Sequence, residues 1–419
     1  MQFSLQSATI FLLSAACSLA GSSPPGVISE PRGELELAQA LALTLARSPE
    51  LEPYSWDVRI AEAAAMQAVA RLNPELSFEV ENALGGGAYR DFDSAEETLS
   101  LSQTIELGRK RMKRTAVARH EIALGEHSFT LKRSEVLNGA TKAFLDVISA
   151  QQELAFAQTA EAMQNDLSEA QGALVEAGKI SPADAESGKA ALAFAEIAVT
   201  NAKAGLDLAR SQLGAFWGNA TPHFTNAVGS IATGTLPSRS SYEAGLADNP
   251  VLAYHAEAIR RHQAAVVLEE AERTPDITIG VGARHFEDSD ESAAVLSISI
   301  PLPLFDRREG QIAKAKAEVG KAEAERESAS AALSAALASA YLRLSAAHRE
   351  AGMLESSAVP AAKRSYDYAD EGYRLGKFSY LELKTAQDAL TSARTLQLRA
   401  RIRFHKARAD LETLAGRTH

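Results

Sequence analysis

The sequence predicts a mainly α-helical protein with a small β part, built from two copies of one structural plan. Residues 48–80 align without a gap on residues 249–281, with matching prolines at the same separation. Four short segments alternate apolar and polar residues, which is the period of a β-strand. Two long segments, 109–175 and 308–374, read as helix almost throughout, and Pro360 is the one proline in them. Each copy therefore runs helix, strand, strand, long helix, tight turn, helix.

Composition excludes several classes of protein. The formal net charge is −11, from 43 Lys and Arg against 54 Asp and Glu, which argues against a nucleic-acid partner. Cys17 is the one cysteine, so an internal disulfide framework, a Cys-ligated zinc site and a Cys-x-x-Cys redox motif are excluded. Past the N-terminus, the longest charge-free run that suits a helix is 328–342, which is shorter than the roughly 18 residues that span a bilayer.

The N-terminus predicts export. Residues 8–20 form an apolar stretch that ends in a small-x-small triplet, so 1–20 is predicted as a signal peptide and 21–33 as a linker. Cys17 is a candidate lipidation site, although Ser14 stands where a lipoprotein signal usually has Leu. Removal of Cys17 with the signal peptide is the alternative.

The strand pattern predicts a sheet with one apolar and one polar face. The predicted strands cover residues 75–82, 97–107, 275–284 and 294–302. The polar positions that would line a water-filled bore are Ser77, Glu79, Ser100, Ser102, Ser297 and Ser299. A soluble sheet with one solvated face is the alternative. Because four strands cannot close a barrel, a membrane location requires several chains to share one; three chains would give twelve strands and an open lumen.

The long helices predict antiparallel hairpins. Each would extend roughly 100 Å at 1.5 Å per residue, and both end in glycine-containing turns, at 176–182 and 375–380. A coiled-coil seam is expected from the spacing of Leu137, Ala140, Phe144, Val147 and Leu154. The predicted boundaries are 34–217 for the first repeat, 218–240 for a linker and 241–416 for the second repeat, and residues 213–238 contain no Asp, Glu, Lys or Arg.

The sequence lacks the common catalytic motifs, which predicts that the protein is not an enzyme. Gly178-Lys179 lacks the upstream glycine of a phosphate loop, and neither Gly-x-Ser-x-Gly nor His-Glu-x-x-His occurs. The histidine pairs 120/127 and 255/262 are two helical turns apart, too far for one helix to offer both to one ion. The acidic loop 285–291 is a solvated loop or a weak cation site. No cofactor and no metal site are expected.

Three segments carry a resemblance to a known family. They are Asn73-Pro74-Glu75-Leu76, Gln103-Thr104-Ile105-Glu106-Leu107-Gly108 and Ile300-Pro301-Leu302-Pro303-Leu304-Phe305-Asp306. Together with the duplicated plan, over roughly residues 34–416, the chain resembles TolC-family outer membrane efflux proteins. The last two segments look most like the cobalt-zinc-cadmium branch, which serves heavy-metal pumps.

The resemblance implies an architecture and partners. It implies a homotrimer with a twelve-stranded β-barrel in outer membrane lipid and an α-helical barrel that crosses the periplasm and closes at its tip. It also implies docking to a periplasmic adaptor and to an inner-membrane RND-type transporter that supplies the energy. The expected function is a passive exit duct for heavy-metal cations. The alternatives are a duct for drugs or for type I secretion and, in another class, a periplasmic coiled-coil adaptor or scaffold.

The resemblance also assigns aperture residues at the two turns. Asp184 lies six residues after Gly178, whereas Tyr373 and Glu382 flank Gly376. In the family an Asp, a Tyr and an Arg link neighbouring hairpins and hold the tip closed. The Arg position is Phe378 here, so Arg374, Lys377 or Lys179 would have to supply the cation. The alternative roles are a first-turn carboxylate for Asp184 and buried packing for Tyr373.

Overall fold

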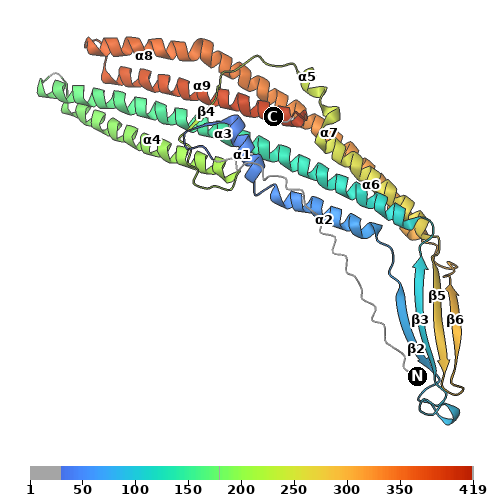
Figure 1. The fold of residues 1–419 in the computed structure, drawn as a ribbon. Helices are drawn as coiled ribbons and strands as arrows, with labels where there is room; N and C mark the ends of the chain where they lie inside the picture. The colour runs from blue at the N-terminus through green and yellow to red at the C-terminus, as the bar shows by residue number, and fades with distance from the viewer. Residues whose placement is uncertain (1–29, 179, 418–419) are drawn as a thin grey trace.

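The chain is elongated, with a long helical body at one end and a β-sheet at the other (Figure 1). The computed structural model describes residues 30–178 and 180–417. The predicted signal peptide, with Cys17, and the candidate cation Lys179 lie outside the described residues.

Helices make up most of the described chain, and the longest helices run along the length of the molecule. The helices of the first half are α1 (Leu37–Arg47), α2 (Glu52–Val69), α3 (Lys110–Glu176) and α4 (Pro182–Ala215). Those of the second half are α5 (Arg239–Glu243), α6 (Pro250–Glu272), α7 (Glu309–Met353), α8 (Val359–Arg374) and α9 (Tyr380–Leu414). Short 3-10 helices cover Gly87–Tyr89 and Leu246–Asp248. With 67 residues, α3 is about 100 Å long. The prediction of a mainly helical protein with a small β part is confirmed.

The one irregularity in the second long helix lies directly before Pro360, the one proline of that segment. There α7 continues through a π-helical turn, Leu354–Ala358, straight into α8. Proline has no N–H to donate to the preceding turn and its ring crowds the carbonyl four residues back, so a wider turn just before it relieves both problems.

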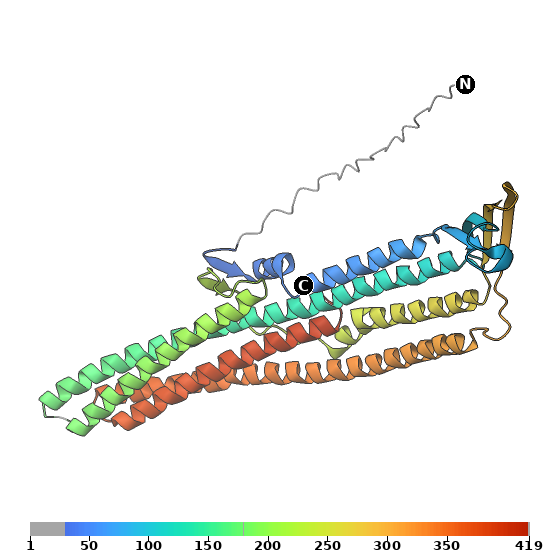
Figure 2. The ribbon, with the colours of Figure 1, turned by 90° about the horizontal axis from the view of Figure 1, so that it is seen from below.

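The two hairpins lie side by side along the helical body (Figure 2). One is formed by α3 and α4 and the other by α8 and α9, and α3 packs against both α4 and α9. The four seam residues Leu137, Ala140, Phe144 and Val147 of α3 are all buried, and they pack against α1, α4 and the segment that follows α4. Long-range burial of this seam, rather than helix propensity alone, stabilises so long a helix.

The sheet is antiparallel and joins the two halves of the chain. Its strands are β2 (Glu75–Glu81), β3 (Glu96–Ile105), β5 (Ile277–Phe286) and β6 (Glu291–Ser299), in the order β2-β3-β5-β6. The central pair, β3 and β5, connects the first repeat to the second. One row across the sheet consists of Leu76, Leu101, Val281 and Leu296, and all four side chains are exposed.

The linker between the repeats contains a strand that the sequence pattern did not predict. Within it, β4 (Asn226–Val228) pairs in parallel with β1 (Glu34–Glu36), which begins where the predicted N-terminal linker ends. The Gln151 side chain of α3 satisfies Ala227, accepting from its N–H at 2.7 Å and donating to its carbonyl at 3.1 Å. The region is therefore fastened to the middle of the helical body. A three-residue strand is too short to show a period of two, so the pattern could not reveal it.

A buried carboxylate ties the two repeats together between α3 and α6. Glu257 of α6 is 5% exposed and bonds His120 of α3 through Nδ1 at 2.6 Å, and it also pairs with Arg260. Burial alone would raise the pKa of this carboxyl, but the His120 hydrogen bond and the Arg260 charge outweigh burial and hold the pKa below its ordinary value.

Glu257→Gln is expected to lower the thermal unfolding midpoint of the purified protein at pH 7 by several degrees, corresponding to about 2 kcal/mol. Because the folded-state pKa is depressed, the stabilisation is present above the ordinary glutamate pKa of about 4.3 and is lost as the pH falls through the lower folded-state value. The unfolding midpoints of the wild type and of Glu257→Gln should therefore converge as the pH is lowered towards 3. The control is Glu121→Gln, which removes a more exposed pair with Arg261 between the same helices. An equal loss in both variants would contradict the special role of Glu257.

Candidate functional site

The strand register brings the six predicted bore residues onto one face of the sheet. Opposite pairs are Ser77 with Ser100, whose hydroxyl oxygens are 2.7 Å apart, and Ser102 with Gly280, which in turn faces Ser297. A further row of hydroxyl groups crosses the sheet at Thr104, Thr278 and Ser299, and the Thr104 and Thr278 hydroxyl oxygens are 2.9 Å apart. Glu79 shares this polar face, since it lies two residues from Ser77.

Two glycines in β5 leave no room for a side chain at the centre of the polar face. A β-carbon at Gly280 would overlap the Ser297 hydroxyl, and one at Gly282 would lie 2.6 Å from the Leu99 carbonyl oxygen. Small residues at these positions leave serine hydroxyl groups as the surface of that face.

A charged cluster on the polar face was missed by sequence reasoning. Arg284 of β5 reaches Glu81 at 2.8 Å and Glu96 at 2.6 Å, and its Nε donates to the Thr98 hydroxyl at 2.9 Å. The signal was present: Arg284 has the same strand parity as Gly280 and Gly282, so it belongs to the polar face. An arginine with two carboxylates can remain charged there without facing lipid.

Cysteine accessibility tests the assignment of the two faces. Ser100→Cys and Ser299→Cys are expected to react with a charged, membrane-impermeant thiol reagent in intact membranes, whereas Leu101→Cys and Ile298→Cys are not. Labelling is measured by mass shift beside the parent chain, which gives the background from Cys17. Equal labelling at all four positions would contradict a bore on one face and lipid on the other.

The far end of the helical body consists of two similar turns. Gly178 and Gly376 follow α3 and α8 with φ of +69° and +71°, a conformation that glycine adopts without strain. Serine caps the helix that follows each turn: the Ser181 hydroxyl accepts from the N–H of Ala183, and the Ser379 hydroxyl accepts from that of Glu382.

The two proposed aperture carboxylates have different local roles. Asp184 is exposed in the first turn of α4, and among the described residues its carboxylate has no hydrogen-bond or ion-pair partner. Glu382 is exposed in the first turn of α9, but its Oε2 accepts from the Ser379 N–H at 2.7 Å in a capping box. These bonds to the backbone and side chain of Ser379 lower the pKa of Glu382. The Ser-x-x-Glu signature was readable in the sequence.

Tyr373 is half-buried between the hairpins rather than free at the rim. It packs on the cluster of Ala369, Leu383 and Ala386, and burial raises the pKa of its phenol. The nearby Gln171 of α3 offsets part of this rise. The packing role considered for Tyr373 is therefore observed.

Phe378, at the position where the family has arginine, folds back onto its own hairpin. Its ring covers Gly372 so closely that a β-carbon there would overlap the ring. The N–H groups of Lys377 and Phe378 both donate to the Gly372 carbonyl, at 2.8 and 3.2 Å. Within the described chain no cation therefore takes the place of the missing arginine beside Asp184.

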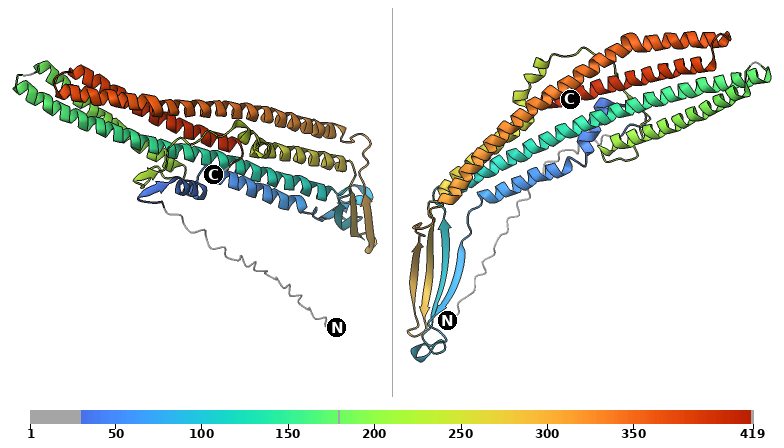
Figure 3. Two further views of the ribbon diagram at one scale, coloured as in Figure 1. Left: turned by 90° about the horizontal axis from the view of Figure 1, so that it is seen from above. Right: turned by 180° about the vertical axis from the view of Figure 1, so that it is seen from behind.

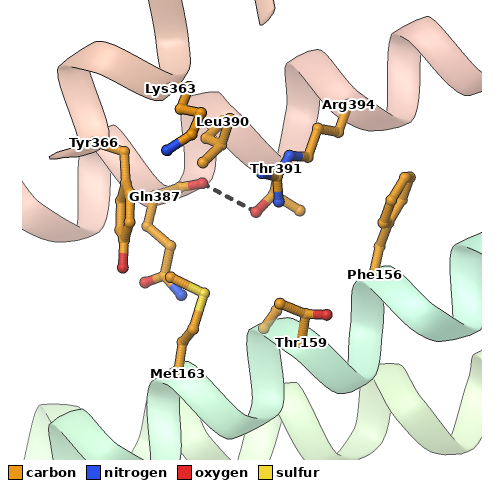
Figure 4. A pocket seen from close by; sticks show the side chains of 10 residues that line it. Phe156, Thr159, Met163, Lys363, Tyr366, Gln387, Leu390, Thr391 and Arg394 are labelled. Atoms are coloured by element: carbon orange, nitrogen blue, oxygen red, sulfur yellow. Dashed lines mark hydrogen bonds between the residues drawn. The ribbon is translucent and has the colours of Figure 1, made fainter.

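A groove separates the two hairpins above the turns (Figure 4). It has a volume of about 230 Å³ and is open to solvent. Side chains from α3 line one wall and those from α8 and α9 the other: Phe156, Thr159, Met163, Lys363, Tyr366, Gln387, Leu390, Thr391 and Arg394. The groove has two basic side chains, Lys363 and Arg394. Lys363 is paired with Asp367 at 2.9 Å.

Among residues 30–178 and 180–417, no three His, Cys, Asp or Glu side chains are grouped closely enough to hold a metal ion. None of the helices in the same part of the chain is both long and apolar enough to cross a bilayer.

The sheet at one end and the paired helical hairpins at the other define a class of protein. The chain is a channel protomer whose four-stranded sheet contributes to a shared barrel and whose hairpins contribute to a helical wall. The chain belongs to the outer membrane efflux protein family, whose profile matches residues 40–219 and 242–417. It is thus a passive channel of the outer membrane that extends into the periplasm, and not an enzyme. Family members are trimers that work in tripartite pumps. The adaptor or scaffold interpretation is excluded.

The similar proteins include metal-resistance proteins. The cobalt-zinc-cadmium resistance protein CzcC of Cupriavidus metallidurans is 30% identical over 93% of this chain and 91% of its own. The nickel and cobalt resistance protein CnrC of the same organism is 30% identical over 73% of this chain and 70% of its own.

Solved structures share the fold at low sequence identity. The outer membrane protein VceC of Vibrio cholerae has a TM-score of 0.74 at 19% identity, covering 91% of this chain and 96% of its own. The MtrE channel of Neisseria gonorrhoeae has a TM-score of 0.74 at 18% identity, covering 91% of this chain and 88% of its own.

Proposed function

We propose that the protein is the outer-membrane exit duct of a tripartite pump that expels heavy-metal cations, with a periplasmic adaptor and an inner-membrane RND-type transporter as partners. The observation that carries the cargo assignment is the similarity to a cobalt-zinc-cadmium resistance protein along nearly the whole of both chains. A homotrimer supplies the twelve strands that close the barrel.

The polar face of the sheet suits such a duct. Serine and threonine hydroxyl groups solvate a passing ion without binding it tightly, and conduction requires weak sites that release the ion. The six residues Ser77, Glu79, Ser100, Ser102, Ser297 and Ser299 are proposed to face the lumen.

The turns are proposed as the aperture. In a trimer, three copies each of Asp184 and Glu382 would place six carboxylates near the narrow end, which favours entry of cations over anions. Tyr373 would hold the two hairpins of one protomer together, and Phe378 would close the turn where the family uses arginine.

Metal tolerance tests the cargo assignment. Deleting the gene in its native host should lower the tolerated concentrations of cobalt, zinc and cadmium salts several-fold, and a plasmid copy should restore them. Tolerance to dyes and detergents is measured in parallel, as is the amount of secreted polypeptide. Loss of dye tolerance with unchanged metal tolerance would instead support organic-solute efflux, and loss of a secreted polypeptide would support type I secretion.

A further inference from the structure

The junction between sheet and helices contains a hollow with unusual chemistry. It lies where β3 ends and α3 begins, at the bend of the molecule that Figure 3 shows from behind. Its volume is about 470 Å³, and its lining includes Arg71, Arg109 and Arg111 together with Leu72 and Met112. Cationic and apolar side chains thus share one small surface.

The acidic side chains around this hollow are already paired. Glu106 pairs with Arg114. Asp276 and Glu272 both pair with the buried Lys110, at 2.8 and 3.7 Å. On the neighbouring helices, Glu269 pairs with Arg308 at 2.8 Å.

The remaining cations have no acidic partner. In the described chain, Arg71, Arg109 and Arg111 are exposed and form no ion pair. Three exposed guanidinium groups within one hollow repel one another, and an anion placed between them would relieve that repulsion. Arginine suits a phosphate in particular, because its planar fork donates two parallel hydrogen bonds.

Exposed apolar side chains continue from this hollow into the lipid-facing side of the sheet. Leu72, Ile105 and Met112 are exposed beside the arginines, and Ile105 shares its strand parity with Leu101 and Leu99. At the start of α7, the other strand-to-helix connection is similar, with Leu302 and Leu304 exposed and Phe305 99% exposed.

The depth of the hollow fits a lipid headgroup. The ten residues of β3 span about 33 Å, or roughly 25 Å of bilayer thickness when tilted, which is the height of the apolar band of an outer-membrane barrel. Residues a few positions beyond Ile105 on the helical side therefore lie at the periplasmic headgroup level. Long basic side chains at that level extend towards phosphates while their stems contact acyl chains.

We infer that Arg71, Arg109 and Arg111 form a binding site for an anionic phospholipid of the periplasmic leaflet. The three guanidinium groups hold the phosphate, and Leu72, Ile105 and Met112 contact the start of the acyl chains. One site per protomer gives three per trimer. The site anchors the junction at which the barrel changes from strands to helices.

Lipid titration of the purified full-length channel tests the site. Native mass spectrometry counts bound dioleoyl-phosphatidylglycerol against dioleoyl-phosphatidylethanolamine, which has the same tails and a zwitterionic headgroup. The wild-type trimer should bind up to three phosphatidylglycerol molecules in preference to phosphatidylethanolamine. The triple variant Arg71→Gln, Arg109→Gln, Arg111→Gln should bind them about 100-fold more weakly, since each basic residue near an anionic lipid contributes roughly a factor of five.

Matched variants separate charge from general effects. Replacing the same three arginines by lysine should keep binding within a few-fold of wild type. Replacing Arg326, Arg349 and Arg364 of the helical body by glutamine removes equal charge away from the membrane and should leave lipid binding unchanged.

Several outcomes would overturn the inference. Equal binding of the two lipids by the wild type would do so and requires no variant, so the test stands even if the glutamine variant fails to assemble. Competition by sn-glycerol 3-phosphate at the lipid's own concentration would instead indicate a site for a free phosphate compound. Failure of both the glutamine and lysine variants to form trimers would place the arginines at an interface between copies.

Discussion

Replacing Asp184 by asparagine and Glu382 by glutamine together is expected to reduce the cation preference of the channel several-fold in planar-bilayer recordings. The double substitution removes six carboxylate charges from the narrow end of a trimer. At separations of several ångströms, each of these charges makes the local potential that a permeating ion experiences more negative. The ratio of cation to anion permeability, measured from reversal potentials in a salt gradient, should therefore move towards one.

The choice of substitutions separates gating charge from helix capping. Glutamine at position 382 can still close the capping box with Ser379, so the variant loses charge while α9 keeps its cap. Ser379→Ala does the reverse, since it removes the cap and keeps the carboxylate. The electrostatic interpretation requires altered selectivity in the first variant and unchanged selectivity in the second.

A charge-matched control addresses distance from the tip. Glu196→Gln with Glu323→Gln removes two exposed carboxylates per protomer from the middle of α4 and α7. Selectivity should stay at the wild-type value in this variant. If the tip variant also keeps wild-type cation preference, Asp184 and Glu382 do not form the aperture.

Patterns that repeat over many residues were readable from the sequence. A period of two over each strand was enough to place Ser77, Ser100 and Ser297 on one face, because parity alone decides the face once the strands pair. The α3 seam was readable for the same reason: Leu137 and Phe144 recur at helical spacing over several turns.

Features that depend on contact between distant or very short segments were not readable. The pairing of β1 with β4 joins two three-residue strands almost two hundred residues apart, and the Gln151 side chain that supports it gives no sequence signal. Strand parity assigns Arg284 to the polar face, but its pairing with Glu81 and Glu96 needed the register of three strands. At the tip, the family comparison predicted where an arginine was missing and not where Phe378 would go.

Restoring the missing cation by Phe378→Arg is expected to stabilise the closed tip and lower conductance. Phe378 now packs on Gly372 within its own hairpin, so removing its ring frees the turn surface without leaving a buried cavity. Asp184 has no partner among the described residues and is available to pair with an arginine from a neighbouring hairpin. An exposed pair contributes about 0.5 kcal/mol, and three pairs in a trimer about 1.5 kcal/mol, which is roughly a tenfold shift of the opening equilibrium.

Two further variants decide whether pairing causes the effect. Phe378→Gln removes the ring without adding charge and should not lower conductance. Asp184→Asn in the Phe378→Arg background removes the partner, so conductance should return to that of the Asp184→Asn single variant, as a double-mutant cycle with strong coupling requires. Salt provides a second criterion, because an exposed ion pair weakens as the Debye length shortens from about 10 Å at 0.1 M to 3 Å at 1 M. A conductance decrease that persists at 1 M salt, or in the absence of Asp184, would mean that the arginine blocks the bore by its size and that the turns of neighbouring protomers do not meet at Asp184.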